Sequence, residues 1–267
     1  MGDVLAVADA QHRLHLSLLG RDRTVLLPML EGPARATDLL PAARAIAHAV
    51  VDVATEHARA EGRTVSCGPA CGACCRQLVP ISLIEARALA SAVDALPPEE
   101  RERKRRRFAD AVRRMEDVGL LARDGKRPRV GLVGSGATEK ERWLDVSTRY
   151  FAAQIACPVL DDESCSMHAD RPVVCREYNV TSPPERCARL DGGAETLPRP
   201  VHVGEALAEV AQQLEGYEVF QIPLALAIEW ADASPRAFEA AHDGERMLEA
   251  LLGALSHEDG VESGSDD

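Results

Sequence analysis

Apolar and polar residues alternate near the amino terminus of the chain. In RLHLSLL, which begins at Arg13, leucines at 14, 16 and 18 alternate with polar residues, and TVLLPML follows after the turn-like segment 20–23. A period of two is typical of half-buried strands, and two such runs around a turn are typical of a hairpin. The sequence therefore predicts a small β-hairpin, which we assign to an amino-terminal segment of residues 1–36.

Most of the remaining chain has apolar positions at helical spacing. This spacing predicts helices over residues 38–61, 82–95, 99–122, 138–156, 203–214, 222–231 and around 247–252. Two of them begin with a capping box, Ser82 with Glu85 and Thr138 with Glu141. In this motif the two side chains satisfy free backbone N–H groups of the first helical turn, so both helix starts are well defined.

The composition agrees with a mainly helical fold. Aromatic residues make up only 3% of the chain, so the core must consist mainly of Leu, Val, Ala and Ile. A chain of 267 residues can bury such a core without disulfide bonds. We expect a mainly α structure, with a helical metal-binding domain over residues 37–255 built around a loop-rich cysteine cluster. The acidic residues 256–267 lack core-forming side chains and are expected to form a disordered tail.

The charge and hydropathy of the chain exclude several partners. With 31 basic and 43 acidic residues the net charge is −12, which argues against nucleic acid. The longest apolar stretch, FQIPLALAIEW, contains Gln221 and Pro223 and is too short to cross a membrane. The first residues, MGDVLAVADAQ, lack the basic segment and apolar run of an export signal, so we expect a cytoplasmic protein.

Two segments could suggest phosphate binding. The basic run at 101–107 could contact phosphates, but glutamates at 99, 100 and 102 lie at or near i,i+4 spacing and favour a solvated, locally paired face. The glycine-rich segment 122–137 contains neither a phosphate loop nor a dinucleotide fingerprint and is predicted to be a mobile loop. The sequence therefore gives no support for a nucleotide site.

The strongest chemical signal is a pair of cysteine groups. Cys67, Cys71, Cys74 and Cys75 form the first group, and Cys157, Cys165, Cys175 and Cys187 form the second. Four thiols in nine residues match the ligand count of a four-cysteine zinc site or a four-thiolate iron–sulfur centre, and two groups permit two sites. Disulfides are the alternative for eight cysteines, but clustered cysteines in a cytosolic protein favour metal binding or catalysis.

Individual cysteines leave open questions. The side chains of consecutive residues point in different directions, so Cys74 and Cys75 are poorly placed to be ligands of the same ion. Either they bind two different metal centres, or one of them is not a ligand. An isolated cysteine such as Cys187 could instead be a small apolar residue packed in the core.

The cysteine-rich segment resembles the YkgJ-type cysteine-cluster family, whose members are described as zinc- or iron-chelating domains with a CxxCxxCC motif. The matching stretches are CGPACGACC and CPVLDDESCSMHADRPVVCREY. The second signature, CPxL, then Cys, then RPxxCR, falls on Cys157, Pro158, Leu160, Cys165, Arg171, Pro172, Cys175 and Arg176. The chain differs from the named motif by one extra residue between Cys67 and Cys71. The resemblance covers residues 67–187 and implies metal chelation without a known general reaction.

The metal and any reaction stay open at this stage. All-thiolate sites suit zinc and iron–sulfur clusters, including a 4Fe-4S cluster, and disfavour magnesium or calcium. A structural zinc protein is the first hypothesis. Some flagellin lysine methylases look similar in their cysteine pattern, so an iron–sulfur-dependent modifying enzyme is the alternative.

Other reactions fit less well. The spacing from Cys67 to Cys74 also matches enzymes that cleave S-adenosylmethionine, but Ala73 replaces their usual aromatic residue and no alternating βα pattern is present. A nucleophilic cysteine beside His57 or His168 is a further alternative. That chemistry needs one activated thiol and not eight, so it fits the cysteine pattern less well.

Several residues of the second signature could assist a metal centre. His168 could replace one thiolate, although a surface position in a polar turn is the simpler prediction. Arg171 and Arg176 could stabilise thiolates by hydrogen bonds, or could pair with Asp170 or Glu177 at the surface.

Overall fold

The computed structural model describes residues 11–123, 128–129, 131–190 and 193–257. Within these residues the fold is mainly helical, as predicted, with short strands that form two-stranded antiparallel sheets. The helices are α1 (Leu40–Ala60), α2 (Leu83–Asp94), α3 (Pro98–Asp117), α4 (Glu139–Ala152), α5 (Val173–Glu177), α6 (Val203–Glu215), α7 (Ala227–Ala233) and α8 (Gly244–His257). No parallel βα barrel is present in this part of the chain.

The predicted amino-terminal hairpin is confirmed, with a tighter turn than expected. Strands β1 (Gln11–Leu18) and β2 (Arg21–Pro28) pair antiparallel, with Leu18 opposite Arg21. The turn therefore contains only Leu19 and Gly20, whose φ angles of 52° and 71° are both positive. Such a two-residue turn matches the twist of the strands, which is why residues 21–23 belong to β2 and not to the turn. The hairpin packs on α1, and Leu27 is fully buried there.

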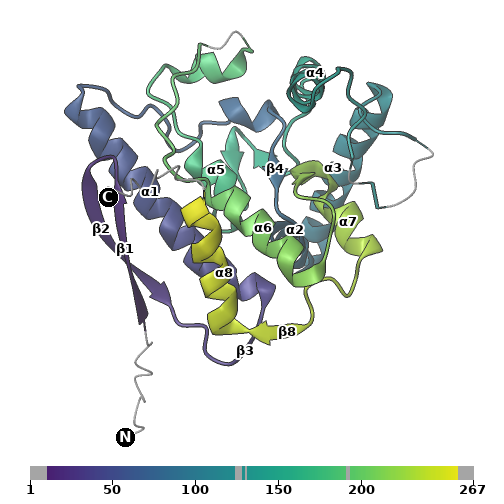
Figure 1. Ribbon diagram of the computed structural model, residues 1–267. Helices are drawn as coiled ribbons and strands as arrows, with labels where there is room; N and C mark the ends of the chain where they lie inside the picture. Colours follow the sequence, from purple (N-terminus) through teal and green to yellow (C-terminus); the bar gives the residue numbers. More distant parts are fainter. Residues whose placement is uncertain (1–10, 124–127, 130, 191–192, 258–267) are drawn as a thin grey trace, which may run out of the picture.

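Helix α1 lies beside the β1–β2 hairpin (Figure 1). It packs against β2, α5 and α6, and its buried face includes Ile46, Val50 and Val53. Pro41 lies in the first turn, and Gly62, with a φ of 75°, follows the end of the helix. Both positions agree with the sequence prediction, because proline fits the start of a helix and glycine its left-handed end.

Both predicted capping boxes are present. Ser82 caps α2 together with Glu85, and Thr138 caps α4 together with Glu141. The prediction for α3 was too long, because the helix ends at Asp117 instead of residue 122. Gly119 takes a φ of 71° two residues later, which reverses the chain.

Short strands and 3-10 helices connect the carboxyl-terminal third to the rest. Strand β3 (Pro33–Arg35) pairs with β8 (Ala241–Asp243), and β4 (Pro80–Ile81) pairs with β7 (Ile222–Pro223). The predicted helix over 222–231 thus begins as β7, continues as the 3-10 helix η5 (Leu224–Leu226) and becomes α7. These pairings tie α7 and α8 to the amino-terminal half.

Parts of some predictions lie outside the described residues. These are residues 1–10 of the predicted amino-terminal segment, residues 124–127 and 130 of the predicted mobile loop, and residues 258–267 of the predicted tail. Helix α8 continues to His257, so the proposed boundary at 256 falls within a helix. Among the helices that the structure describes, none is long and apolar enough to cross a membrane.

Candidate metal centre

The first cysteine group lies in a loop that ends in a short 3-10 helix. Gly72 begins the helix η2 (Ala73–Arg76), which carries Cys74 and Cys75. A Cβ at Gly72 would lie 2.5 Å from Glu163 Oε2 and 2.8 Å from a methyl group of Leu160. A larger residue here would have to displace the Glu163 and Leu160 side chains, so glycine favours the close approach of the loop to the turn of the second group.

A backbone hydrogen bond joins the two groups directly. The Cys157 N–H donates to the Cys75 carbonyl oxygen at 2.7 Å, although the residues are far apart in sequence. Residues after Cys157 form the small hairpin β5 (Leu160–Asp161) and β6 (Ser164–Cys165), in which Leu160 lies opposite Cys165. The hairpin returns Cys165 to the neighbourhood of Cys157.

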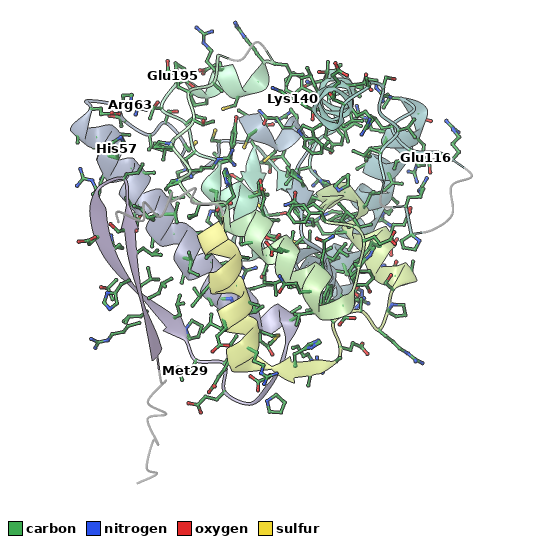
Figure 2. The ribbon with its side chains drawn as sticks, viewed as in Figure 1. Met29, His57, Arg63, Glu116, Lys140 and Glu195 are labelled. Atoms are coloured by element: carbon green, nitrogen blue, oxygen red, sulfur yellow. The ribbon has the colours of Figure 1, made fainter. Side chains whose placement is uncertain are left out.

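A second junction lies at the other end of the loop. The Val180 N–H donates to Cys67 Sγ at 3.4 Å, and the Ser66 N–H donates to the Val180 carbonyl at 3.0 Å. Cys187 lies in the 3-10 helix η4 (Pro184–Ala188), and Gln77 Nε2 donates to its carbonyl at 2.9 Å. The outer edge of this junction is visible in Figure 2, where Arg63 and Glu195 lie at the same side of the molecule. Thr181 lies between them, because its hydroxyl accepts from Arg63 Nη1 at 3.5 Å and contacts the Glu195 carbonyl at 3.4 Å.

The thiols of the two groups lie close enough to influence one another electrostatically. The Cys75 thiol donates to Cys74, which lowers the pKa of Cys74 to about 6 and raises that of Cys75. Burial raises the pKa of Cys157 to about 11, with a smaller contribution from Cys165. Burial also raises the pKa of Cys187 to about 11, with Cys74, Cys67 and Cys71 as contributing neighbours. A metal ion that binds would therefore displace protons from the thiols whose pKa is raised.

All eight cysteines are free thiols, and no disulfide links them. Cys187 is buried, and the other seven are half-buried. Across the described residues, no three His, Cys, Asp or Glu side chains are already arranged to hold a metal ion. The chain thus brings the thiols of both groups into one region, and the final closure around an ion would require side-chain rotation. Sulfur donors from a half-buried, cysteine-only region suit zinc or an iron–sulfur centre.

Four basic side chains lie next to these thiols. Arg171 is an electrostatic neighbour of Cys67, Cys74 and Cys175 and favours their thiolate forms. Arg107 acts in the same way on Cys157. Two further cations, Lys104 and Arg76, lie near Cys165 and Cys75 respectively. Arg171 donates a hydrogen bond to the backbone carbonyl of Cys175 and not to a thiol, so it acts on the thiols through its charge and not through the predicted hydrogen bonds.

The basic run at 101–107 is only in part the solvated, locally paired face that the sequence suggested. Only Arg103 and Arg106 pair locally, with Glu100 and Glu102. Lys104 is fully buried and contacts Asp161 and Ser166, and Arg107 contacts Asp161 and the Leu160 carbonyl. This part of α3 packs on the hairpin of the second cysteine group through Lys104 and Arg107, whereas Arg103 and Arg106 are exposed.

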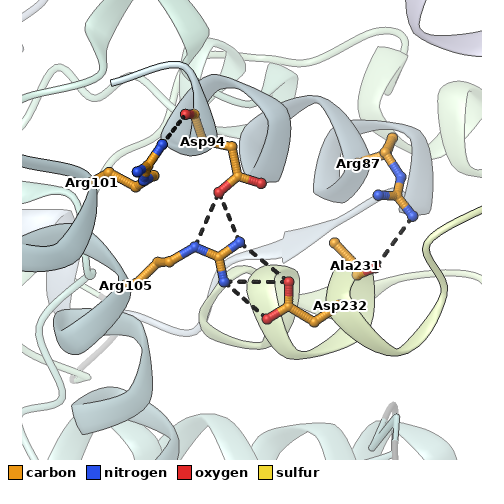
Figure 3. A network of polar contacts seen from close by, with 6 residues as sticks. All are labelled: Arg87, Asp94, Arg101, Arg105, Ala231 and Asp232. Atoms are coloured by element: carbon orange, nitrogen blue, oxygen red, sulfur yellow. Dashed lines mark hydrogen bonds and ion pairs between the residues drawn. The ribbon is translucent and has the colours of Figure 1, made fainter. Parts of the chain in front are cut away.

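Arg105 links α3 to two other helices (Figure 3). Its guanidinium donates to Asp94 Oδ1 at 2.7 Å and to Asp232 Oδ2 at 3.0 Å. Neither partner could be found from spacing along α3, because Asp94 ends α2 and Asp232 lies in α7. Tertiary packing instead of local pairing therefore accounts for this charge.

The remaining candidates have structural contacts. His168 is exposed, as predicted for a surface histidine. Arg176 donates to the carbonyls of Arg171 at 2.9 Å and Ala169 at 2.7 Å, which holds the turn before α5. Glu177 accepts from the N–H groups at the start of α6 and is not a partner of Arg176. Tyr178, which sequence reasoning left without a role, donates its hydroxyl to Cys187 and lowers the pKa of that thiol against the larger effect of burial.

The fold and the thiol arrangement define a class of protein, a helical scaffold around a metal-chelating cysteine cluster. Residues 66–192 match the model of the CxxCxxCC family, which is described as "Putative zinc- or iron-chelating domain". This segment includes all eight cysteines, and the resemblance seen in the sequence is confirmed over it. The comparisons with curated proteins and with solved structures gave no significant match.

Proposed function

We propose that the thiolates of both cysteine groups bind the metal. The proposed ligands are Cys67, Cys71, Cys74, Cys75, Cys157, Cys165, Cys175 and Cys187. The observation that carries this proposal is the junction at Cys75, whose carbonyl accepts from the Cys157 N–H at 2.7 Å. The two groups meet there from segments that are separated in sequence by the whole of α2, α3 and α4.

The first role we assign to the metal is structural. The loops that carry the thiols contain little regular structure, so an ion would stabilise them by cross-linking distant segments. Structural zinc contributes on the order of 10–16 kcal/mol of binding free energy, comparable with the stability of a whole domain. We propose residues 37–255 as the metal-binding domain and residues 1–36 as an attached hairpin segment.

Iron is the other metal that the same thiolates suit. A 4Fe-4S cluster needs four thiolates and would add colour and redox activity. A role as an iron–sulfur modifying enzyme would require such a cluster. We propose a cytoplasmic location in either case, because eight free thiols persist in a reducing compartment.

The test is metal analysis of protein purified without oxygen, together with its visible absorption spectrum. We expect zinc in a colourless protein, and loss of bound metal in Cys71→Ser and in Cys175→Ser. His168→Ala is the matched control and should keep the wild-type metal content, because its side chain is exposed. A brown protein that contains sulfide would show that the bound centre is an iron–sulfur cluster and not zinc.

Two results would contradict the proposal. One is wild-type protein free of zinc, iron and sulfide. The other is an unchanged metal content in both cysteine variants.

A further inference from the structure

We propose that the eight thiols form two separate metal centres, and that each centre takes ligands from both cysteine groups. Set one contains Cys67, Cys71, Cys74 and Cys187. Set two contains Cys75, Cys157, Cys165 and Cys175. This inference rests on the proposed function and goes beyond it by giving the number of ions and the ligands of each.

Set one is assembled by the segment that follows α5. Val180 donates its N–H to Cys67 Sγ at 3.4 Å, which places the start of the loop beside residues 180–187. Gln77 then fixes η4 from the other side by donating to the Cys187 carbonyl at 2.9 Å. Cys187 is consequently an electrostatic neighbour of Cys74, Cys67 and Cys71. Three thiols of the first group thus lie near one thiol of the second.

Set two is assembled by the β5–β6 hairpin and α5. The Cys157 N–H is bonded to the Cys75 carbonyl, and the hairpin register brings Cys165 back beside the same segment. Cys157 and Cys175 are electrostatic neighbours of Cys75, and Cys165 is a neighbour of Cys157. One thiol of the first group thus joins three of the second.

The division falls between Cys74 and Cys75. Consecutive residues direct their side chains differently, so one ion cannot easily take both. Cys75 is drawn to Cys157 by the backbone bond, whereas Cys74 is a neighbour of both Cys67 and Cys187. Cys74 also neighbours Cys75, Cys157 and Cys175, so the two centres lie next to each other with Cys74 at their boundary. Assigning Cys74 to set one gives each centre four thiols, the usual number for a structural zinc site.

The nearby cations agree with two adjacent centres. A zinc ion with four thiolates carries a net charge of about −2, so two such centres repel each other. Arg171 lies between them as a neighbour of Cys67 in set one and Cys175 in set two. Lys104 and Arg107 lie on the side of set two. Basic groups at these positions reduce the repulsion and stabilise the thiolates.

Double variants distinguish this division from one in which each sequence group holds its own ion. The reduced chain is loaded with zinc alone, and bound zinc is counted by native mass spectrometry. We expect two zinc ions in the wild type and one in Cys67→Ser/Cys187→Ser, because both substitutions fall in set one. We expect none in Cys157→Ser/Cys187→Ser, because each set loses a ligand. If each sequence group held its own ion, the counts would be reversed. Cys67→Ser/Cys187→Ser would bind no zinc, and Cys157→Ser/Cys187→Ser would bind one zinc ion.

A measurement on the wild type covers the case in which a double variant does not fold. The metal-free, reduced chain is treated with a short thiol-specific cross-linker, and the joined peptides are identified. We expect links within each set, such as Cys71 to Cys187 and Cys75 to Cys157. Links between Cys67 and Cys157 or between Cys187 and Cys175 would overturn the division.

The zinc count also separates this inference from the proposed function. One zinc ion in the wild type would overturn the two-centre division and leave metal chelation intact. Wild-type protein that binds no zinc and carries neither iron nor sulfide would overturn both.

Discussion

Lys104 is the residue whose position differs most from its sequence context. It lies in the most basic stretch of the chain, yet its side chain is 0% exposed and contacts Asp161 and Ser166. Burial, followed by the nearby Arg107, lowers the pKa of its ammonium group. Asp161 belongs to the hairpin that carries Cys165, so Lys104 connects α3 to set two.

Substitution Lys104→Met should destabilise the protein by about 1–3 kcal/mol, because Asp161 and Ser166 lose a buried hydrogen-bond donor. Arg107 still contacts Asp161, which keeps the effect below that of an unpaired buried charge. Chemical denaturation of the metal-free protein measures the loss. The control is Arg106→Met, an exposed position on the same helix, which should change stability by less than about 0.5 kcal/mol. Equal stability of the two variants would contradict a connecting role for Lys104.

At the scale of single elements, the two capping boxes show what local sequence can and cannot predict. Both were predicted from four-residue patterns, and both are present at the starts of α2 and α4. Their surroundings differ, because Ser82 is fully buried and Thr138 is exposed. Glu85 also accepts from the Val173 N–H at 2.6 Å, so the capping box of α2 holds the start of α5, which carries Cys175.

We expect Ser82→Ala to lower the free energy of unfolding by about 1–2 kcal/mol and Thr138→Ala by about 0.5–1 kcal/mol. The difference has a physical reason, since alanine at 82 leaves the buried Glu85 carboxylate without the Ser82 hydroxyl that donates to it at 2.9 Å. Urea denaturation of both variants under the same conditions makes the comparison. A larger loss for Thr138→Ala would show that the buried contacts of Ser82 add nothing.

Helix ends and partners were less predictable than helix starts. The end of α3 at Asp117, five residues before the predicted end at 122, depends on Gly119, whose left-handed conformation reverses the chain. The segment 222–231 has a helical apolar pattern, but its first residues pair with β4 and become a strand. Spacing reports which residues are buried, and it does not report which distant segment provides a strand partner.

At the scale of the whole molecule, two regions have different sources of stability. Helices α1, α2, α6 and α8 share an apolar core of Leu, Val, Ile and Ala side chains. The segments 67–80 and 157–190 contain only short helices and strands, and contacts between the two cysteine groups join them. A metal-free chain should therefore open locally in these loops before it unfolds globally.

Removal of metal by a chelator should raise hydrogen exchange in residues 67–80 and 157–190 by at least tenfold. Exchange in α1 and α8 should change little, because their bonds belong to the apolar core. Hydrogen-exchange mass spectrometry of loaded and stripped protein gives both readouts in one experiment. Uniform protection of the cysteine loops after metal removal would contradict a stabilising metal.

The sequence alone determined the local features of this protein: the hairpin, most helices, both capping boxes and a set of eight thiols suited to a soft metal. These follow from periodicity and hydrogen bonds that act within a few residues. Only the tertiary structure decided that Cys75 meets Cys157, that Cys67 approaches residues 180–187, and that Lys104 faces inward. Such contacts join segments as many as 113 residues apart, and their partners are selected by how the helices pack and not by spacing along the chain.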